Sequence, residues 1–425
     1  MIKKIFKNYE KIFMIFLYLQ PFLDLSAGIM LHFNINLTIS SVIRILFMMM
    51  SFLYLILYIR NKKLNIYLGC LILYFIMFVT TVLITKGYPA LFYEAKNLIT
   101  TYYFVVVLLT LICLYKKNKF NFKNLLIIYI IYLICLFIPN VFNIGFNSYY
   151  ESKTGSVGWF LSANSVGSIL SIILPILLIN IKKINLKVLI LGLINLYVIF
   201  GIGTKVPVLA FILVIGINAL YYIITLIRKK EYKKLSIILL PIILVLVLST
   251  FIFPKTSFYK NLVIHINYLE KKDNGKITTW HIIDHFIFSE RLSFEEKTRK
   301  AYNKSSILEK AFGIGYIENY STDKVRLKTV EMDYFDVFYR HGIFGFIIFF
   351  YPLIYVLKGI LSSKYKLNKK TLNVGISILL IFILALFQGH IFVNPANSIY
   401  AALILALTYN KTLDIKYKRG CNEIK

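Results

Sequence analysis

The chain has 425 residues, of which 59% are hydrophobic and 16% are charged, and its formal net charge is +30. A mean hydropathy of +0.73 excludes an ordinary soluble domain and predicts an all-α, polytopic membrane protein. The basic residues lie in gaps between apolar segments, and the aromatic residues are spread through those segments. Nucleic acid is therefore not an expected partner.

Twelve segments approach the length of about 20 mostly apolar residues that a membrane-crossing helix needs. The last segment is short and two others nearly touch around 201–205, so eleven or thirteen spans remain open. The first segment follows lysines but lacks a small-residue cleavage site, which favours an uncleaved span over a signal peptide. The predicted spans are 12–31, 38–59, 64–84, 97–115, 124–144, 157–179, 187–203, 206–227, 235–253, 337–357, 372–392 and 396–410.

The placement of Lys and Arg predicts the topology. The amino-terminal segment and alternate loops hold 29 of these residues, whereas the other short loops hold only Lys86, Lys96, Lys153 and Lys205. By the positive-inside rule, both termini are cytoplasmic and the long polar segment faces outward. We therefore divide the chain into spans 1–9 (1–253), a large, partly helical extracellular loop (254–336), and spans 10–12 with a basic tail (337–425). The Ile, Lys, Asn, Tyr and Phe content is typical of an AT-rich bacterial genome, which predicts a bacterial plasma membrane.

Local patterns predict short helices in the large loop. Apolar residues recur every three or four positions from Ile277 to Ile287, which predicts an amphipathic helix over 277–288 at the membrane surface. Two capping boxes are expected to open further helices, Ser293 with Glu296 and Ser306 with Glu309, and Gly313 is expected to end the second.

The carboxyl end of the loop is predicted to be a helical run that continues straight into span ten. Asp333, Asp336 and Arg340 share one face of this run, and His341 follows directly. These four residues are the catalytic candidates. Asp336 and Asp333 are the first choices for accepting a proton, and an ion pair of Asp336 with Arg340 is the structural alternative.

Charged side chains within spans mark a second candidate region. Asp24 in span one and Arg44 in span two are both expected near the outer leaflet. They form either a structural ion pair or part of a polar substrate cavity. With Glu94, Lys96 and Lys205 they suggest a polar vestibule that opens outward.

Two further chemistries are weakly supported. His281 and His285 are spaced for zinc on one helix face, but they lack a GluXXHis signature and an obvious third ligand, so no metal site is expected. The chain also lacks a nucleophile elbow and a dinucleotide fingerprint. Arginine is better suited to the chemistry of this loop because it binds phosphate oxygens bidentately. The candidates are Arg291, Arg326 and Arg340, whereas Arg299 fits a solvated surface charge.

Several short segments together resemble the O-antigen polymerase and O-antigen ligase family of bacterial membrane glycosyltransferases. About twelve spans with one large outer loop after the ninth also match this family. The resemblance covers nearly the whole chain and rests on Gln20–Asp24, Gly203–Lys205, Ser289–Arg291, Phe312–Tyr316, Glu331–Asp336 and Arg340–Gly345.

The resemblance implies a metal-independent transfer of glycan from undecaprenyl pyrophosphate, with no cofactor and with arginines on the pyrophosphate. Arg291 matches the family's loop arginine, and Lys205 stands where many relatives have arginine. Many ligases carry a His-Asn pair before span ten, where this chain has Glu331, Asp333 and Asp336. The substrate-binding candidates are thus Arg291, Lys205, Asp24 and Arg44, and the general base stays open.

The function predicted from the sequence is polymerisation of lipid-linked repeat units into a capsular or other surface polysaccharide. A ligase that moves finished glycan to another acceptor is the alternative within the same class. A lipid-linked oligosaccharide flippase is the alternative in another class, although the large outer loop argues against it. A non-catalytic assembly partner also stays open. The expected partners are the lipid-linked oligosaccharide, membrane lipid, a flippase and a chain-length regulator.

Overall fold

The computed structural model describes residues 6–35, 39–59, 61–114, 120–149, 153–181, 185–232, 253–272, 283–317, 329–362 and 367–423. These residues form helices and one isolated antiparallel bridge, between Asn147 and Ser156. Among them, nine helices are long and apolar enough to cross a membrane. They are α2 (Tyr9–His32), α3 (Ile39–Leu57), α4 (Lys62–Lys86), α5 (Tyr88–Leu114), α6 (Phe122–Val141), α7 (Ala163–Asn180), α9 (Lys205–Arg228), α15 (Asp333–Leu361) and α16 (Lys369–Phe387).

Two further helices coincide with predicted spans. The shorter apolar helix α8 (Leu186–Ile202) covers the seventh, and α17 (Pro395–Glu423) covers the twelfth. The predicted ninth span, 235–253, lies outside the described residues except for Phe253 in the 3₁₀ turn η2 (Phe253–Lys255). The predicted all-α, polytopic membrane fold is confirmed.

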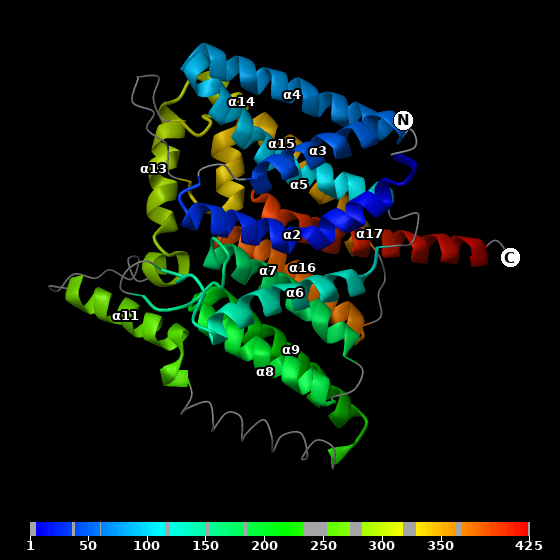
Figure 1. The fold of residues 1–425 in the computed structure, drawn as a ribbon. Helices are drawn as coiled ribbons and strands as arrows, with labels where there is room; N and C mark the ends of the chain where they lie inside the picture. The colour runs from blue at the N-terminus through cyan, green and yellow to red at the C-terminus, as the bar shows by residue number, and fades with distance from the viewer. Residues whose placement is uncertain are drawn as a thin grey trace.

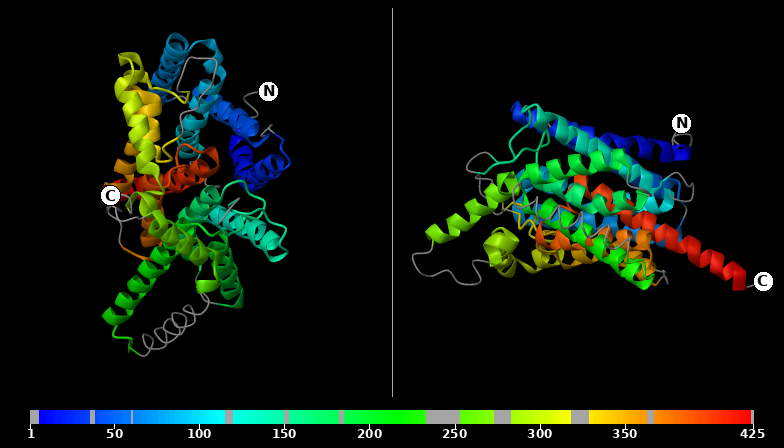
Figure 2. Two further views of the ribbon diagram at one scale, coloured as in Figure 1. Left: turned by 90° about the vertical axis from the view of Figure 1, so that its left-hand side faces the viewer. Right: turned by 90° about the horizontal axis from the view of Figure 1, so that it is seen from below.

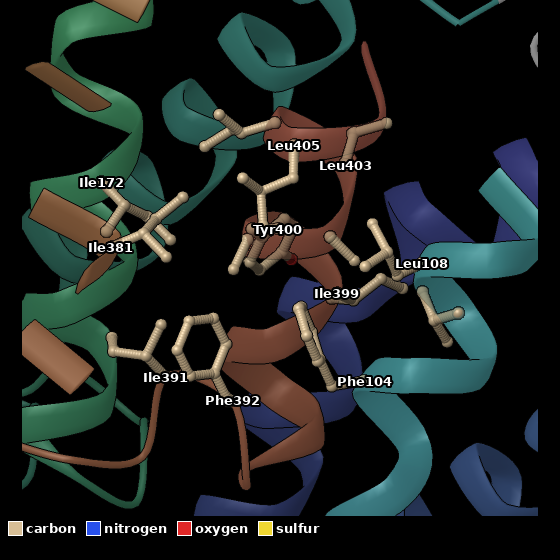
Figure 3. Close-up of a cluster of buried hydrophobic side chains, with 14 of the residues drawn as sticks. Phe104, Leu108, Ile172, Ile381, Ile391, Phe392, Ile399, Tyr400, Leu403 and Leu405 are labelled. Carbon is tan, nitrogen blue, oxygen red and sulfur yellow. The ribbon is translucent and has the colours of Figure 1, made fainter. Parts of the chain in front are cut away.

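The first half of α17 lies in the middle of the bundle. Its residues from Ser398 to Asn410 are all buried, and α5 packs against it. Figure 3 shows Phe104 and Leu108 of α5 close to Ile399 and Leu403 of α17. A helical segment this enclosed is mostly apolar because it has no side that faces solvent or lipid.

The two ends of the bundle differ in chemistry. Both termini lie at one end, which we name the terminal end, and α11 (Ser257–Lys272) and α13 (Arg291–Lys304) lie at the other, the loop end (Figures 1 and 2). Asparagine side chains cap four helices that start at the terminal end. These caps are Asn61, Asn121, Asn185 and Asn368, which accept from backbone amides of α4, α6, α8 and α16.

Two local predictions in the loop have different outcomes. Ser306 and Glu309 form the predicted capping box of α14 (Ile307–Phe312), which ends at Gly313. The predicted box at Ser293 is wrong, since α13 already begins at Arg291. Ser293 Oγ instead donates to Asp284 Oδ2 at 2.8 Å. A carboxylate nine residues earlier in the chain therefore replaces the local cap.

The structure tests two longer predicted helices to different extents. Of the predicted helix 277–288, the part before Ile283 lies outside the described residues, and the remainder is a π-helical turn, η3 (Asp284–Phe288). The run from Glu331 does not continue straight into the membrane. Helix α15 is interrupted at Gly342, whose φ of 66° and ψ of −173° are not helical.

Candidate functional site

The two aspartates at the start of α15 bind backbone amides. Asp333 accepts from the N–H groups of His390, Ile391 and Phe392 at 2.6, 2.9 and 2.6 Å. Asp336 accepts from the N–H groups of Val330 and Glu331, both at 2.9 Å. Each carboxylate thus fixes a turn beside α15, which offsets the cost of burying its charge.

Arg340 and His341 are both fully buried and meet the turn that follows α14. Arg340 Nη1 donates to the Gly315 carbonyl at 3.0 Å, and its guanidinium lies 5.4 Å from the centre of the Tyr316 ring. The Tyr316 hydroxyl lies 3.1 Å from His341 Nε2 and 2.9 Å from Thr101 Oγ1. His341 Nδ1 is buried without a hydrogen-bond partner among the described residues.

The interruption at Gly342 makes room for this turn. A Cβ at Gly342 would lie 2.6 Å from the backbone of Ala311 and Gly313, so only glycine fits. The carbonyls of Tyr339 and Arg340 accept from Ile314 and Gly315, both at 3.1 Å. The broken helix therefore bonds to the loop instead of to its own next turn.

A buried ion pair between α4 and α5 holds the same turn. Glu94 of α5 pairs with Lys86 of α4 at 2.7 Å and also accepts from the amides of Tyr316 and Ile317 at 2.8 and 2.9 Å. Lys86 Nζ donates in addition to the Ile314 carbonyl. We name Lys86, Glu94, Thr101, Tyr316, Arg340 and His341 the Arg340 cluster.

Sequence reasoning did not select Lys86, Thr101 or Tyr316 as site residues. Lys86 ends α4, and Glu94 lies in the second turn of α5, which begins directly after Gly87. This opposition of charges across a hairpin is a sequence signal for an ion pair. No comparable local signal exists for Tyr316, which is 222 residues from Glu94.

A second cluster combines residues of α11 and α13 with Lys205 at the start of α9. Lys205 lies within electrostatic range of Lys153 and Arg291, and His265 Nδ1 lies 2.9 Å from His285 Nε2. We name these five residues the cation cluster. The structure thus brings together Arg291 and Lys205, which lie in different predicted regions of the sequence.

The Arg291 side chain is held by two segments. Its Nη2 pairs with Glu331 at 2.9 Å, and its Nη1 donates to the Phe288 carbonyl at 3.2 Å. Its Nε is buried without a hydrogen-bond partner among the described residues. Asp284 accepts from the Leu292 amide at 3.0 Å and so caps α13 in place of a local residue. The guanidinium is therefore fixed in one orientation.

The backbone around Arg291 is strained. Ser289 and Glu290, which directly precede it, have φ values of 52° and 68°, and Glu331 and His390 have values of 60° and 63°. Such positive values cost free energy in residues other than glycine and gather at functional sites. A π-helical turn, also common at such sites, directly precedes the strained pair.

Asn261 of α11 organises the two lysines. Its Nδ2 donates to the Thr154 and Gly203 carbonyls at 2.6 and 2.9 Å, and its Oδ1 accepts from the Thr154 amide at 2.8 Å. Thr154 is next to Lys153, and Gly203 is two residues from Lys205. One side chain on α11 therefore fixes the backbone beside both cations.

The histidines of this region are neutral at neutral pH. Burial and the positive charges of Lys205 and Lys153 lower the pKa of His265 to about 3. Burial also lowers the pKa of His285, with Glu290 acting in the opposite direction. The positive charge of the cluster therefore comes from its lysines and Arg291.

The histidine spacing noted in the sequence does not correspond to the pairing observed. His285 contacts His265, twenty residues earlier, and His281 lies outside the described residues, as does Arg326. Within the described part of the chain, no group of three His, Cys, Asp or Glu side chains is placed to hold a metal ion.

Asp24 and Arg44 form a separate network between α2, α3 and α6. Arg44 Nη2 pairs with Asp24 at 2.5 Å, and Arg44 Nε donates to Gln20 Oε1 at 3.0 Å. Tyr132 donates to the other Asp24 oxygen at 2.6 Å and lies 3.3 Å from the Tyr400 hydroxyl. The predicted ion pair is confirmed; the polar cavity stays a prediction.

The fold and these clusters define a multi-pass helical membrane protein that buries charged groups at one end of its bundle. Residues 6–279 and 279–412 match the model of a family described as O-antigen ligase like membrane protein, so the chain belongs to that family. No curated protein matches the chain. The family gives the general activity, which is glycan transfer at a membrane by a glycosyltransferase-type enzyme.

Proposed function

We propose that the protein polymerises undecaprenyl-pyrophosphate-linked oligosaccharide repeat units into a capsular or other surface polysaccharide on the outer face of a bacterial plasma membrane. The loop end is then the outer end, and both termini are cytoplasmic, in agreement with the distribution of lysines. A flippase that delivers the units and a regulator of chain length are the expected protein partners.

The cation cluster is the main observation that supports this proposal. Lys205 lies within electrostatic range of both Lys153 and Arg291, and Glu331 is the ion-pair partner of Arg291. Partly buried like charges repel, and an anion that enters between them relieves this repulsion. A pyrophosphate carries the required charge, and a fixed guanidinium binds its oxygens.

In the proposed reaction, a hydroxyl oxygen of the acceptor sugar attacks the anomeric carbon of the donor glycan. The bond from that carbon to the pyrophosphate oxygen breaks, and undecaprenyl pyrophosphate leaves with the electron pair. The cations stabilise the charge that develops on the leaving group. They supply the charge that a metal ion would otherwise provide, so the proposed reaction is metal-independent and needs no cofactor.

We propose that the Tyr316 hydroxyl accepts the proton of the acceptor hydroxyl while it passes its own proton to His341, which is the final proton acceptor. His341 Nε2 already contacts the Tyr316 hydroxyl, and its Nδ1 has no partner among the described residues. The oxygens of Asp333 and Asp336 are engaged by backbone amides, which favours a positioning role for both. Arg340 then holds Tyr316 and the turn that carries it.

Transfer to an acceptor that is not lipid-linked, as in a ligase, is the second candidate. The description of the matching family favours it. Purified protein in lipid, supplied only with lipid-linked repeat units, tests the choice. A ladder of longer lipid-linked glycans supports polymerisation. Products that form only after a second acceptor is added overturn it in favour of the ligase.

A further inference from the structure

The described part of the chain has a pocket of about 460 Å³ near the terminal end, far from the two clusters. This volume lies within the range of roughly 300–1,000 Å³ that is usual for small-molecule sites. Its wall is apolar except for two asparagines. It is lined by Leu126 and Ile130 of α6, Leu177, Asn180 and Ile181 at the end of α7, and Asn185, Val188 and Leu191 at the start of α8.

The pocket lies beside surfaces that face lipid in a membrane. On α6, Ile127 and Ile134 are 46% and 48% exposed, and on α8, Leu189 and Leu193 are 54% and 59% exposed. Exposed aliphatic side chains on spanning helices contact acyl chains. An acyl chain therefore has direct access to the pocket and matches its apolar wall.

Three described lysines lie beside this pocket. Lys123 precedes the lining residue Leu126 by three positions, and Lys187 precedes Leu191 by four, so each lies one turn along the same helix face. Lys369 Nζ adds a third ammonium, which donates to the Ile181 carbonyl at 2.8 Å.

The polar groups of the pocket suit the same ligand. Asn185 accepts from the Val188 amide through Oδ1, which leaves its Nδ2 as a donor at the amino terminus of α8. The positive end of a helix dipole favours an anion at this position. The pocket therefore has an apolar wall for acyl chains, followed by an amide donor and lysines for a phosphate. This is the order in which a phospholipid carries these groups.

We propose that this pocket binds one anionic phospholipid, with an acyl chain against Leu126, Ile130 and Leu191 and its phosphate between Lys123 and Lys187. Basic pockets between helices on the lysine-rich side of a membrane bind anionic headgroups in this way. The site does not depend on the proposed glycan chemistry, since it is built from other helices at the opposite end of the bundle.

Native mass spectrometry of the purified protein tests the proposal, with phosphatidylglycerol and phosphatidylcholine added in equal amounts. The wild type is expected to retain phosphatidylglycerol about 30-fold better, because each lysine near an anionic headgroup contributes about 1 kcal/mol. The double variant Lys123→Gln/Lys187→Gln should lose most of this preference. The matched control Lys62→Gln/Lys63→Gln, at the start of α4, should keep it.

A second variant separates the pocket from general surface charge. Leu191→Trp fills the pocket and leaves every lysine in place, so it should also reduce retained phosphatidylglycerol. The site would be overturned if Leu191→Trp retained as much phosphatidylglycerol as the wild type, or if the Lys62/Lys63 control lost as much as the Lys123/Lys187 variant. Either result would mean that the lipid is attracted only to the basic surface in general. Size-exclusion chromatography of each variant confirms that the bundle is folded.

Discussion

The guanidinium of Arg291 lies 2.9 Å from the carboxylate of Glu331, forty residues further along the chain. The amide of Glu331 is in turn held by Asp336 at 2.9 Å. This chain of contacts connects the cation cluster to α15, which carries Arg340 and His341. The proposed leaving-group site and the proposed proton acceptor are thus both fixed to α15. A reaction that uses both groups needs them held in a defined relative position.

Replacing Arg291 tests the proposed leaving-group site. Arg291→Ala should lower the rate of glycan transfer by about 100-fold, which is typical for removal of one group that stabilises developing negative charge. Arg291→Lys should recover part of the rate. Lysine keeps the charge but cannot donate to the Glu331 carboxylate and the Phe288 carbonyl at the same time. Arg299→Ala, on the exposed face of α13, is the matched control and should retain activity. Equal rates for the Arg291→Ala variant and the wild type would exclude Arg291 from the site.

The effect of Asn261→Ala should appear mainly in substrate binding. The loss of three hydrogen bonds frees the backbone beside Lys153 and Lys205, so KM for the lipid-linked donor should rise several-fold while kcat falls less. Steady-state kinetics measure both. Ile266→Ala, an exposed position of the same helix, is the control. A fall in kcat alone would contradict a positioning role for Asn261.

The free energy of unfolding should fall as the pH decreases below about 6.5. The pKa of His265 is lowered from 6.5 to about 3, and that of His285 is also lowered. Between these values the unfolded chain binds protons that the native protein does not, so acid favours unfolding. His265→Gln should make the melting temperature in detergent less sensitive to pH between about 7.5 and about 5. The same pH dependence in both proteins would show that His265 has no part in it.

Features that depend on neighbouring residues were predictable from the sequence. Apolar length identified the described spans, and the Ser306 box formed as expected because both partners lie within one helical turn. The Ser293 box failed for a non-local reason, since Asp284 accepts from the Leu292 amide and from the Ser293 hydroxyl across a turn with positive φ values. Local propensity is a weak prior when a buried carboxylate competes for the cap.

The candidate site was only partly predictable because its contacts join distant segments. A charged side chain within a membrane span costs free energy unless it is paired, which identifies Asp24 and Arg44 as partners. Their ion pair is present in the structure. The contact of Glu94 with Tyr316 spans 222 residues, and a single sequence has no periodicity that encodes such a distance. Asp333 and Asp336 were chosen for their chemistry, yet their amide partners depend on tertiary structure.

The buried pair of Lys86 and Glu94 gives the sharpest test of how the turn at Tyr316 is held. Glu94→Gln leaves the Lys86 ammonium, whose side chain is 4% exposed, without a compensating charge, which should cost about 3–5 kcal/mol. The double variant Lys86→Met/Glu94→Gln should cost less than the sum of the single variants, since it removes both charges. Unfolding in a detergent titration measures all three, and Glu296→Gln, which breaks the exposed pair with Lys300, should leave stability unchanged. Strict additivity of the two buried substitutions would mean that the ion pair does not anchor the turn.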